Sequence, residues 1–189
     1  MQTLAAIKQK LDSAPSVAVR GTLVRLVPLV PLIKHQPLDW LFTSGKPNRY
    51  NPAGIECLYF AEREATARAE YEHYWTGLVG EKQPLVTYYA EVYLDQVLDL
   101  TSTRTVRAIG IKPADLFVDW RRAKRLTLTQ LIGQAVNECS SFSAVRYASK
   151  AAKEAGLIGT NIVVFREKLH HPNSVRILGP TKRTLQSWP

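Results

Sequence analysis

The pattern of apolar and polar positions predicts helices and strands interspersed along the chain. Helical spacing, strong helix formers or a leading proline predict helices at residues 4–11, 61–75, 113–120 and 126–139, and a short helical or coiled stretch at 149–155. β-branched and aromatic runs predict strands at 17–30, 55–60, 85–100, 142–147, 161–165 and 175–178. Because no regular strand–helix–strand rhythm appears, we expect one α+β domain over 1–189, with a mixed, mostly antiparallel sheet and surrounding helices.

A long irregular stretch interrupts this pattern between residues 34 and 51. It is rich in turn residues, among them Pro37, Gly45, Pro47 and Asn48. Long loops inside compact domains are uncommon, and they often carry functional side chains. We therefore expect binding residues in this part of the chain.

The composition fits an ordinary globular protein with a basic surface. The 189 residues are 46% hydrophobic and 22% charged, which is enough apolar material for one core, and the net charge is +9. A basic balance suits polyanionic partners such as nucleic acid, a phosphorylated cofactor or an acidic protein. No apolar run is long enough for a membrane span or a signal peptide, so we expect a cytoplasmic protein without membrane contact.

Several common templates of catalysis and metal binding are missing from the sequence. The chain has no glycine-rich dinucleotide fingerprint, no phosphate-binding P-loop, no H-E-x-x-H zinc motif and no G-x-S-x-G nucleophile elbow. His170 and His171 are adjacent, so their side chains point apart on an extended chain. We expect no metal site.

One ordered set of short motifs does stand out. The segments are Val24-Arg25-Leu26-Val27-Pro28, Arg49-Tyr50-Asn51-Pro52-Ala53-Gly54, Leu58-Tyr59-Phe60-Ala61, Thr66-Ala67-Arg68-Ala69-Glu70, Tyr147-Ala148-Ser149 and Gly159-Thr160-Asn161-Ile162-Val163-Val164-Phe165. Together they resemble the RES-domain family, over about residues 19–165. Each motif alone is weak, but this number in the family's order is fairly specific.

The resemblance implies a fold like that of ADP-ribosyltransferases and NAD as the substrate. It also implies a bacterial toxin neutralised by an Xre-type helix-turn-helix antitoxin, and a homodimer within such a complex would be consistent with it. Members of the family hydrolyse NAD, split it with phosphate or transfer ADP-ribose to a protein, and these three outcomes stay open for this chain. Residues 170–189 lie beyond the resemblance.

The chemistry of NAD cleavage assigns roles to six residues. The transition state carries positive charge on the ribose, so a fixed carboxylate is the main need, and Glu70 is the candidate. Arg25 and Arg49 are expected to bind the pyrophosphate or the nicotinamide ribose through their guanidinium forks. The other three roles are stacking or ribose binding by Tyr50, a bond to a ribose hydroxyl or to Glu70 by Ser149, and attraction of phosphate by Lys46.

A basic nucleic-acid-binding protein without catalysis is the alternative hypothesis. It rests on the net charge of +9 and on the dense basic run from Arg121 to Arg125. The chain lacks a helix-turn-helix signature, an aromatic RNA-binding pattern and a zinc motif. The enzyme hypothesis is therefore favoured.

Overall fold

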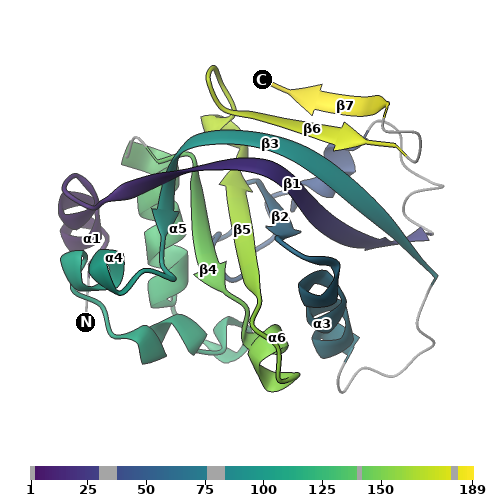
Figure 1. The fold of residues 1–189 in the computed structure, drawn as a ribbon. Coiled ribbons are helices and arrows are strands. Elements are labelled where there is room, and N and C mark those ends of the chain that lie inside the picture. Colours follow the sequence, from purple (N-terminus) through teal and green to yellow (C-terminus); the bar gives the residue numbers. More distant parts are fainter. Residues whose placement is uncertain (1–2, 30–37, 76–83, 140–141, 180–182) are drawn as a thin grey trace.

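The computed structural model describes residues 3–29, 38–75, 84–139, 142–179 and 183–189 of the chain. In these residues one sheet has the strand order β1-β2-β5-β4-β3-β6-β7 (Figure 1). The strands are β1 (Ser16–Pro28), β2 (Cys57–Ala61), β3 (Leu85–Asp99), β4 (Ala144–Ala148), β5 (Thr160–Phe165), β6 (Ser174–Leu178) and β7 (Thr184–Trp188). Neighbours are antiparallel except for the parallel pair β3–β4, so the expected mixed α+β class is confirmed.

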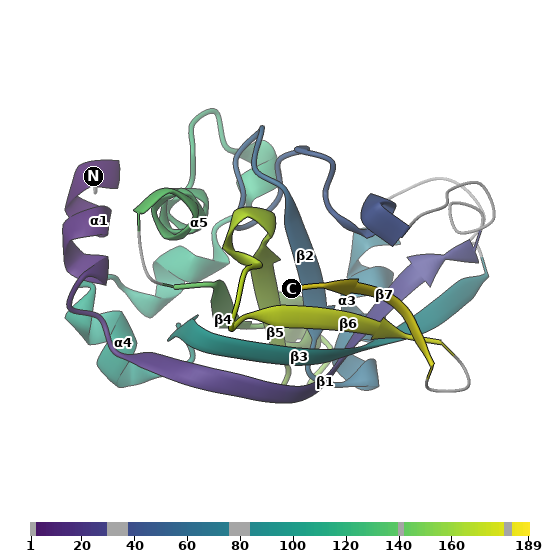
Figure 2. The same ribbon diagram turned by 90° about the horizontal axis from the view of Figure 1, so that it is seen from above.

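The two long strands close part of this sheet on itself. β1 pairs with β3 from Ser16 opposite Leu98 to Pro28 opposite Leu85, and Val24 also pairs with Ala61 of β2. Strands β1, β2, β5, β4 and β3 thus form a closed circuit of hydrogen bonds, and β6 and β7 extend from β3 (Figure 2). Closure satisfies the backbone groups that an open edge would leave free.

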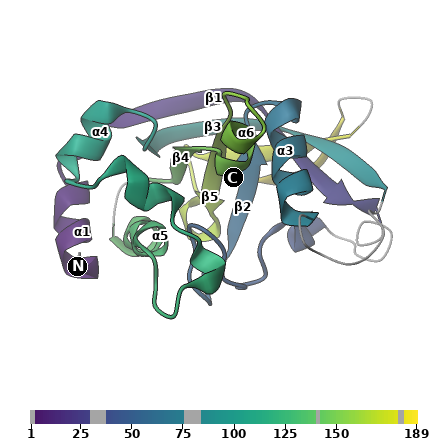
Figure 3. The ribbon, with the colours of Figure 1, turned by 90° about the horizontal axis from the view of Figure 1, so that it is seen from below.

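Helices cover the closed part of the sheet at two places (Figure 3). α1 packs against α5, and α3 packs against β1, β2 and α6. The helices are α1 (Leu4–Leu11), α3 (Glu64–Trp75), α4 (Thr103–Ala108), α5 (Leu128–Cys139) and α6 (Lys150–Glu154), with the 3₁₀ helices η1 (Leu38–Leu41), η2 (Pro113–Phe117), η3 (Trp120–Arg122) and η4 (Arg166–Lys168). The apolar face of α5, with Ile132 and Val136, joins one core cluster with Val145 of β4 and Val163 of β5.

The sequence pattern and the structure differ in several elements, among them the following. The stretch expected to contain strands at 85–100 forms one continuous strand, β3, which ends at Asp99 and pairs with β1 from Leu85 to Leu98. The helix expected at 113–120 is replaced by two short 3₁₀ helices, η2 and η3. β7 was not expected from the sequence. It pairs with β6, and Trp188 packs its ring 5.1 Å from that of Phe42 and donates a hydrogen bond to Asp39.

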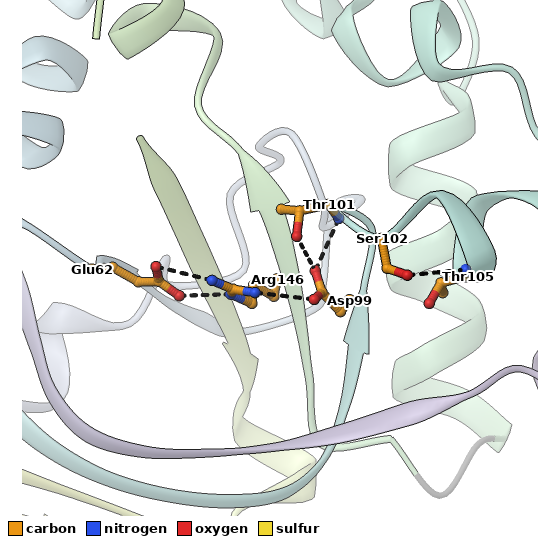
Figure 4. Close-up of polar contacts among 6 residues, drawn as sticks. All are labelled: Glu62, Asp99, Thr101, Ser102, Thr105 and Arg146. Atoms are coloured by element: carbon orange, nitrogen blue, oxygen red, sulfur yellow. Dashed lines mark hydrogen bonds and ion pairs between the residues drawn. The ribbon is translucent and has the colours of Figure 1, made fainter. Parts of the chain in front are cut away.

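A partly buried charge network joins Glu62 after β2, Arg146 of β4 and Asp99 at the end of β3 (Figure 4). Arg146 of β4 donates to both carboxylate oxygens of Glu62, at 2.6 and 3.2 Å, and to Asp99 at the end of β3, at 3.0 Å. Thr101 donates two further bonds to Asp99. The hydrogen bond to Glu62 is the main reason why the pKa of Arg146 is raised. The network links β4 to its neighbour β3 and, across the intervening strand β5, to the residue that follows β2.

Across the described ranges, none of the helices has both the length and the apolar character needed to cross a membrane.

Candidate active site

A pocket of about 300 Å³ opens between α3, the strands β1, β2, β4 and β5, the segment before β2, and η3. Arg25, Arg49 and Glu70 line it together, although they lie far apart in the sequence. The other lining residues are Val24, Leu26, Thr43, Asn48, Tyr59, Phe60, Ala61, Ala67, Tyr71, His73, Tyr74, Trp120, Arg121, Tyr147 and Asn161. Three of the residues predicted from the motifs therefore share one pocket.

Strand register creates the floor of this pocket. Asn161 of β5 lies opposite Tyr147 of β4 and opposite Ala61 of β2, and Ala61 pairs in turn with Val24 of β1. Residues directly opposite one another in antiparallel strands point to the same face. The four side chains thus form one row across the sheet, in which Asn161 and Tyr147 supply the polar groups.

The carboxylate of Glu70 is held in place at one oxygen. Its Oε1 accepts hydrogen bonds from Ser149 Oγ at 2.7 Å and from Asn161 Nδ2 at 2.6 Å. No bond to Oε2 occurs within the described ranges, so this oxygen is available to a ligand. Ser149 also caps α6 by accepting from the amide of Ala152, so it has both the capping role and the bond to Glu70.

Close packing of α3 brings Glu70 to the sheet. Gly159, which precedes β5, lies so near the helix that a Cβ there would be 2.6 Å from Thr66 Oγ1 and 2.5 Å from Ala152 Cβ. The small side chain of Ala69 packs against Ala152 in the same region. Glycine and alanine at these contacts let the helix approach closely enough for Glu70 to reach Asn161.

Arg25 of β1 is part of the pocket wall. Its Nη1 is buried and has no hydrogen-bond partner within the described part of the chain. Burial lowers the pKa of Arg25 from 12.5 to about 10, so the side chain is still charged at neutral pH. A guanidinium that lines a pocket and has one buried, unsatisfied nitrogen is expected to bind an anion, since such a nitrogen is costly to leave without a partner.

Replacing Arg25 with methionine is expected to stabilise the ligand-free protein. Because the folded-state pKa is below the unfolded value, the charged side chain costs stability at neutral pH, on the order of 2 kcal/mol. This cost declines as the pH rises through about 10. Urea unfolding of the two proteins measures the effect. The exposed Arg68→Met is the control with unchanged stability, and a less stable Arg25→Met would contradict the assignment.

Arg49 is presented by an ordered loop. The buried Asn51 donates to the carbonyls of Lys46 and Ile55 and accepts from the hydroxyl of Tyr59 at 2.8 Å. Arg49 Nη1 donates to the carbonyl of Leu116, at 3.2 Å. The loop is thus fixed from inside by one amide side chain, which explains why a stretch rich in turn residues can position a guanidinium.

The side chains of Tyr50 and Lys46 do not line this pocket. Tyr50 has no exposed surface, and its ring packs 4.4 Å from that of Tyr147 below the pocket, so no face is open for a stacking ligand. Its backbone amide donates to the hydroxyl of Tyr59, which does line the pocket. Lys46 is exposed and is not part of the pocket wall. Burial raises the pKa of Tyr50, Tyr59 and Tyr147, so all three stay protonated at neutral pH.

The sequence motifs assign no role to Asn161, and they do not include the residues of the outer wall of the pocket. Asn161 sits in a hydrophobic strand, where an asparagine is costly unless its amide is bonded, and that was the available signal. Trp120 and Arg121 of η3 line the pocket from a segment outside every motif. Arg121 belongs to the basic run, whose residues 121–125 are all exposed. Nucleic-acid binding by this run stays a prediction.

Within the parts of the chain that the structure describes, no group of three or more histidine, cysteine, aspartate or glutamate side chains could hold a metal ion.

Known proteins resemble the chain in sequence and in fold. Among solved structures, one chain of the M. tuberculosis MbcT–MbcA toxin–antitoxin complex is similar at a TM-score of 0.62 and 17% identity, covering 98% of this chain and 92% of that one. At this identity the likeness shows the fold. No curated protein matches the sequence significantly. The family model of the RES domain matches residues 33–185, which include the motifs from Arg49 to Phe165, and the chain therefore belongs to the RES-domain family.

Proposed function

We propose that the protein is an enzyme that consumes NAD by cleaving the bond between nicotinamide and ribose. The observation that carries this proposal is a fixed carboxylate, Glu70, in the same pocket as Arg25, whose buried Nη1 has no hydrogen-bond partner within the described residues. NAD needs both groups, because its pyrophosphate is anionic and its ribose becomes cationic during cleavage. The fold would then be a variant of the ADP-ribosyltransferase type, as its family membership implies.

Glu70 stabilises the positive charge that develops on the ribose. Its Oε1 is occupied by Ser149 and Asn161, so the carboxylate is oriented before substrate binds and Oε2 faces the ligand. Preorganised charge of this kind lowers a barrier because nothing has to reorient during the reaction. The bond between the ribose C1 and the nicotinamide nitrogen breaks, nicotinamide leaves with the electron pair as a neutral molecule, and no proton has to be supplied to it.

Arg25 and Arg49 bind the pyrophosphate in this proposal. Arg25 gains the hydrogen-bond partner that its buried Nη1 lacks, and Arg49 approaches from the loop on another side of the pocket. Tyr50 has a positioning role, since it packs under Tyr147 and fixes the hydroxyl of Tyr59. Lys46 contributes at most long-range attraction from the surface, which salt would screen.

The products of the reaction identify the group that accepts the ADP-ribose. Water or phosphate attacks the ribose C1 and gives up a proton to solvent, and the product is ADP-ribose or its phosphate ester. We expect purified protein to consume NAD, and chromatography with and without added phosphate identifies the acceptor. If neither product forms while labelled ADP-ribose attaches to protein, the acceptor is a side chain. Unchanged NAD with and without phosphate, together with no label attached to protein, would refute the proposal.

The proposed biological role is that of a toxin held inactive by an antitoxin. The support is membership in the RES-domain family and the likeness in fold to a chain of a toxin–antitoxin complex. An Xre-type antitoxin and a homodimer within the complex are the expected assembly. Expression without an antitoxin should lower cellular NAD before growth stops. Growth arrest at an unchanged NAD level would contradict this role.

A further inference from the structure

The pocket has an inner and an outer end that differ in chemistry. Tyr147 and Asn161 at the floor are 7% and 4% exposed, whereas Tyr74 is 57% exposed and Arg121 is also an exposed residue. Glu70 contacts the floor through Asn161, so the proposed reaction takes place at the inner end. The outer end carries aromatic rings and a cation that the reaction itself does not use.

The side chain of Arg121 stacks on the ring of Trp120 at this outer end. The guanidinium of Arg121 lies 5.0 Å from the centroid of the Trp120 ring, in the geometry of a cation–π contact. Asp119 caps η3 by accepting from the backbone amide of Arg121 at 3.1 Å, which fixes the turn that presents both side chains. Arg121 has no acidic side-chain partner within the described ranges, so its charge is available to a ligand.

We propose that Trp120 and Arg121 form a subsite for the adenosine monophosphate half of NAD. This inference rests on the proposed function, since it needs the nicotinamide ribose at Glu70 and the pyrophosphate near Arg25. The adenosine then extends toward the outer end, where a purine stacks on a flat indole or guanidinium surface. The charge of Arg121 attracts the adjacent phosphate. The two residues thus set nucleotide affinity and specificity while Glu70 sets the rate.

Three variants and one probe test this subsite. The probe is AMP, whose binding is measured by calorimetry and therefore does not depend on catalysis. Arg121→Gln removes the charge, and Trp120→Leu keeps apolar bulk but removes the stacking surface. Arg122→Gln is the matched control, because its side chain is 91% exposed, carries the same charge in the same turn and does not line the pocket.

We expect wild-type protein to bind AMP, and both subsite variants to bind it about tenfold more weakly, the loss of one stacking or phosphate contact. Arg122→Gln should match the wild type. For NAD, the subsite variants should raise KM by a similar factor with kcat unchanged. The proposed subsite is contradicted if the wild-type protein binds no AMP, or if all three variants bind AMP with the same affinity. Wild type that binds AMP as expected but cleaves no NAD would refute the proposed function and leave the nucleotide subsite standing.

Discussion

Glu70→Gln is expected to lower the rate of NAD cleavage by about a thousandfold while the protein stays folded. The substitution keeps the size of the side chain and its contact with Ser149, but it removes the negative charge that we propose acts on the ribose. Removing one preorganised electrostatic group from an active site typically costs a factor of about 10² to 10³ in kcat. Initial rates of NAD loss measure the effect, and KM should change little because the charge acts mainly in the transition state.

Glu72→Gln is the matched control for this experiment. Glu72 lies two residues further along the same helix, is exposed and does not line the pocket. Its rate should equal that of the wild type. A fully active Glu70→Gln, with a thermal transition like that of the wild type, would remove Glu70 from the mechanism.

Gly133→Ala is expected to destabilise the protein by on the order of 3 kcal/mol and to abolish NAD binding. Gly133 lies in α5, and a Cβ there would be 1.6 Å from the carbonyl oxygen of Tyr50. Either α5 or the loop that contains Tyr50 has to move, and this loop also carries Arg49. Helix propensity alone predicts the opposite sign, since alanine is favoured over glycine by about 1 kcal/mol inside a helix. Urea unfolding and NAD binding by calorimetry measure the two effects.

The control for Gly133→Ala is a glycine with free space around it. Gly156 has a φ of +72°, and nothing lies within 4 Å of a Cβ there. Gly156→Ala should cost only about 1 kcal/mol from the strained backbone and leave NAD binding intact. A Gly133→Ala protein as stable as the wild type would show that α5 and the loop do not approach as closely as described.

An element could be predicted from the sequence where the residues of that segment alone determine its secondary structure. The helix at residues 4–11 has the expected bounds, and the strand at 161–165 is extended by one residue, because spacing and buried β-branched residues suffice there. β7 could not be predicted, because its five residues are mostly polar and its stability comes from pairing with β6 and from the contact of Trp188 with Phe42. The closure of β1 on both β3 and β2 likewise depends on long-range pairing that no local pattern encodes.

Only those residues of the candidate site that belong to the motifs could be predicted from the sequence. Arg25, Arg49 and Glu70 meet in one pocket, and Ser149 contacts Glu70 from behind. Tyr50 neighbours Arg49 in sequence, but its side chain points into the core, because consecutive residues of an extended loop face different sides. The sequence alone does not place η3 over the pocket, so the outer wall depends on tertiary packing.

The most direct test of the account is the stoichiometry of nicotinamide release by the purified protein. NAD and free nicotinamide are measured together over time. If Glu70 and Arg25 act as proposed, one nicotinamide appears for each NAD lost. NAD that stays constant in the presence of folded protein would contradict the account, and so would NAD that disappears without free nicotinamide, because the bond cleaved would then lie elsewhere in the molecule.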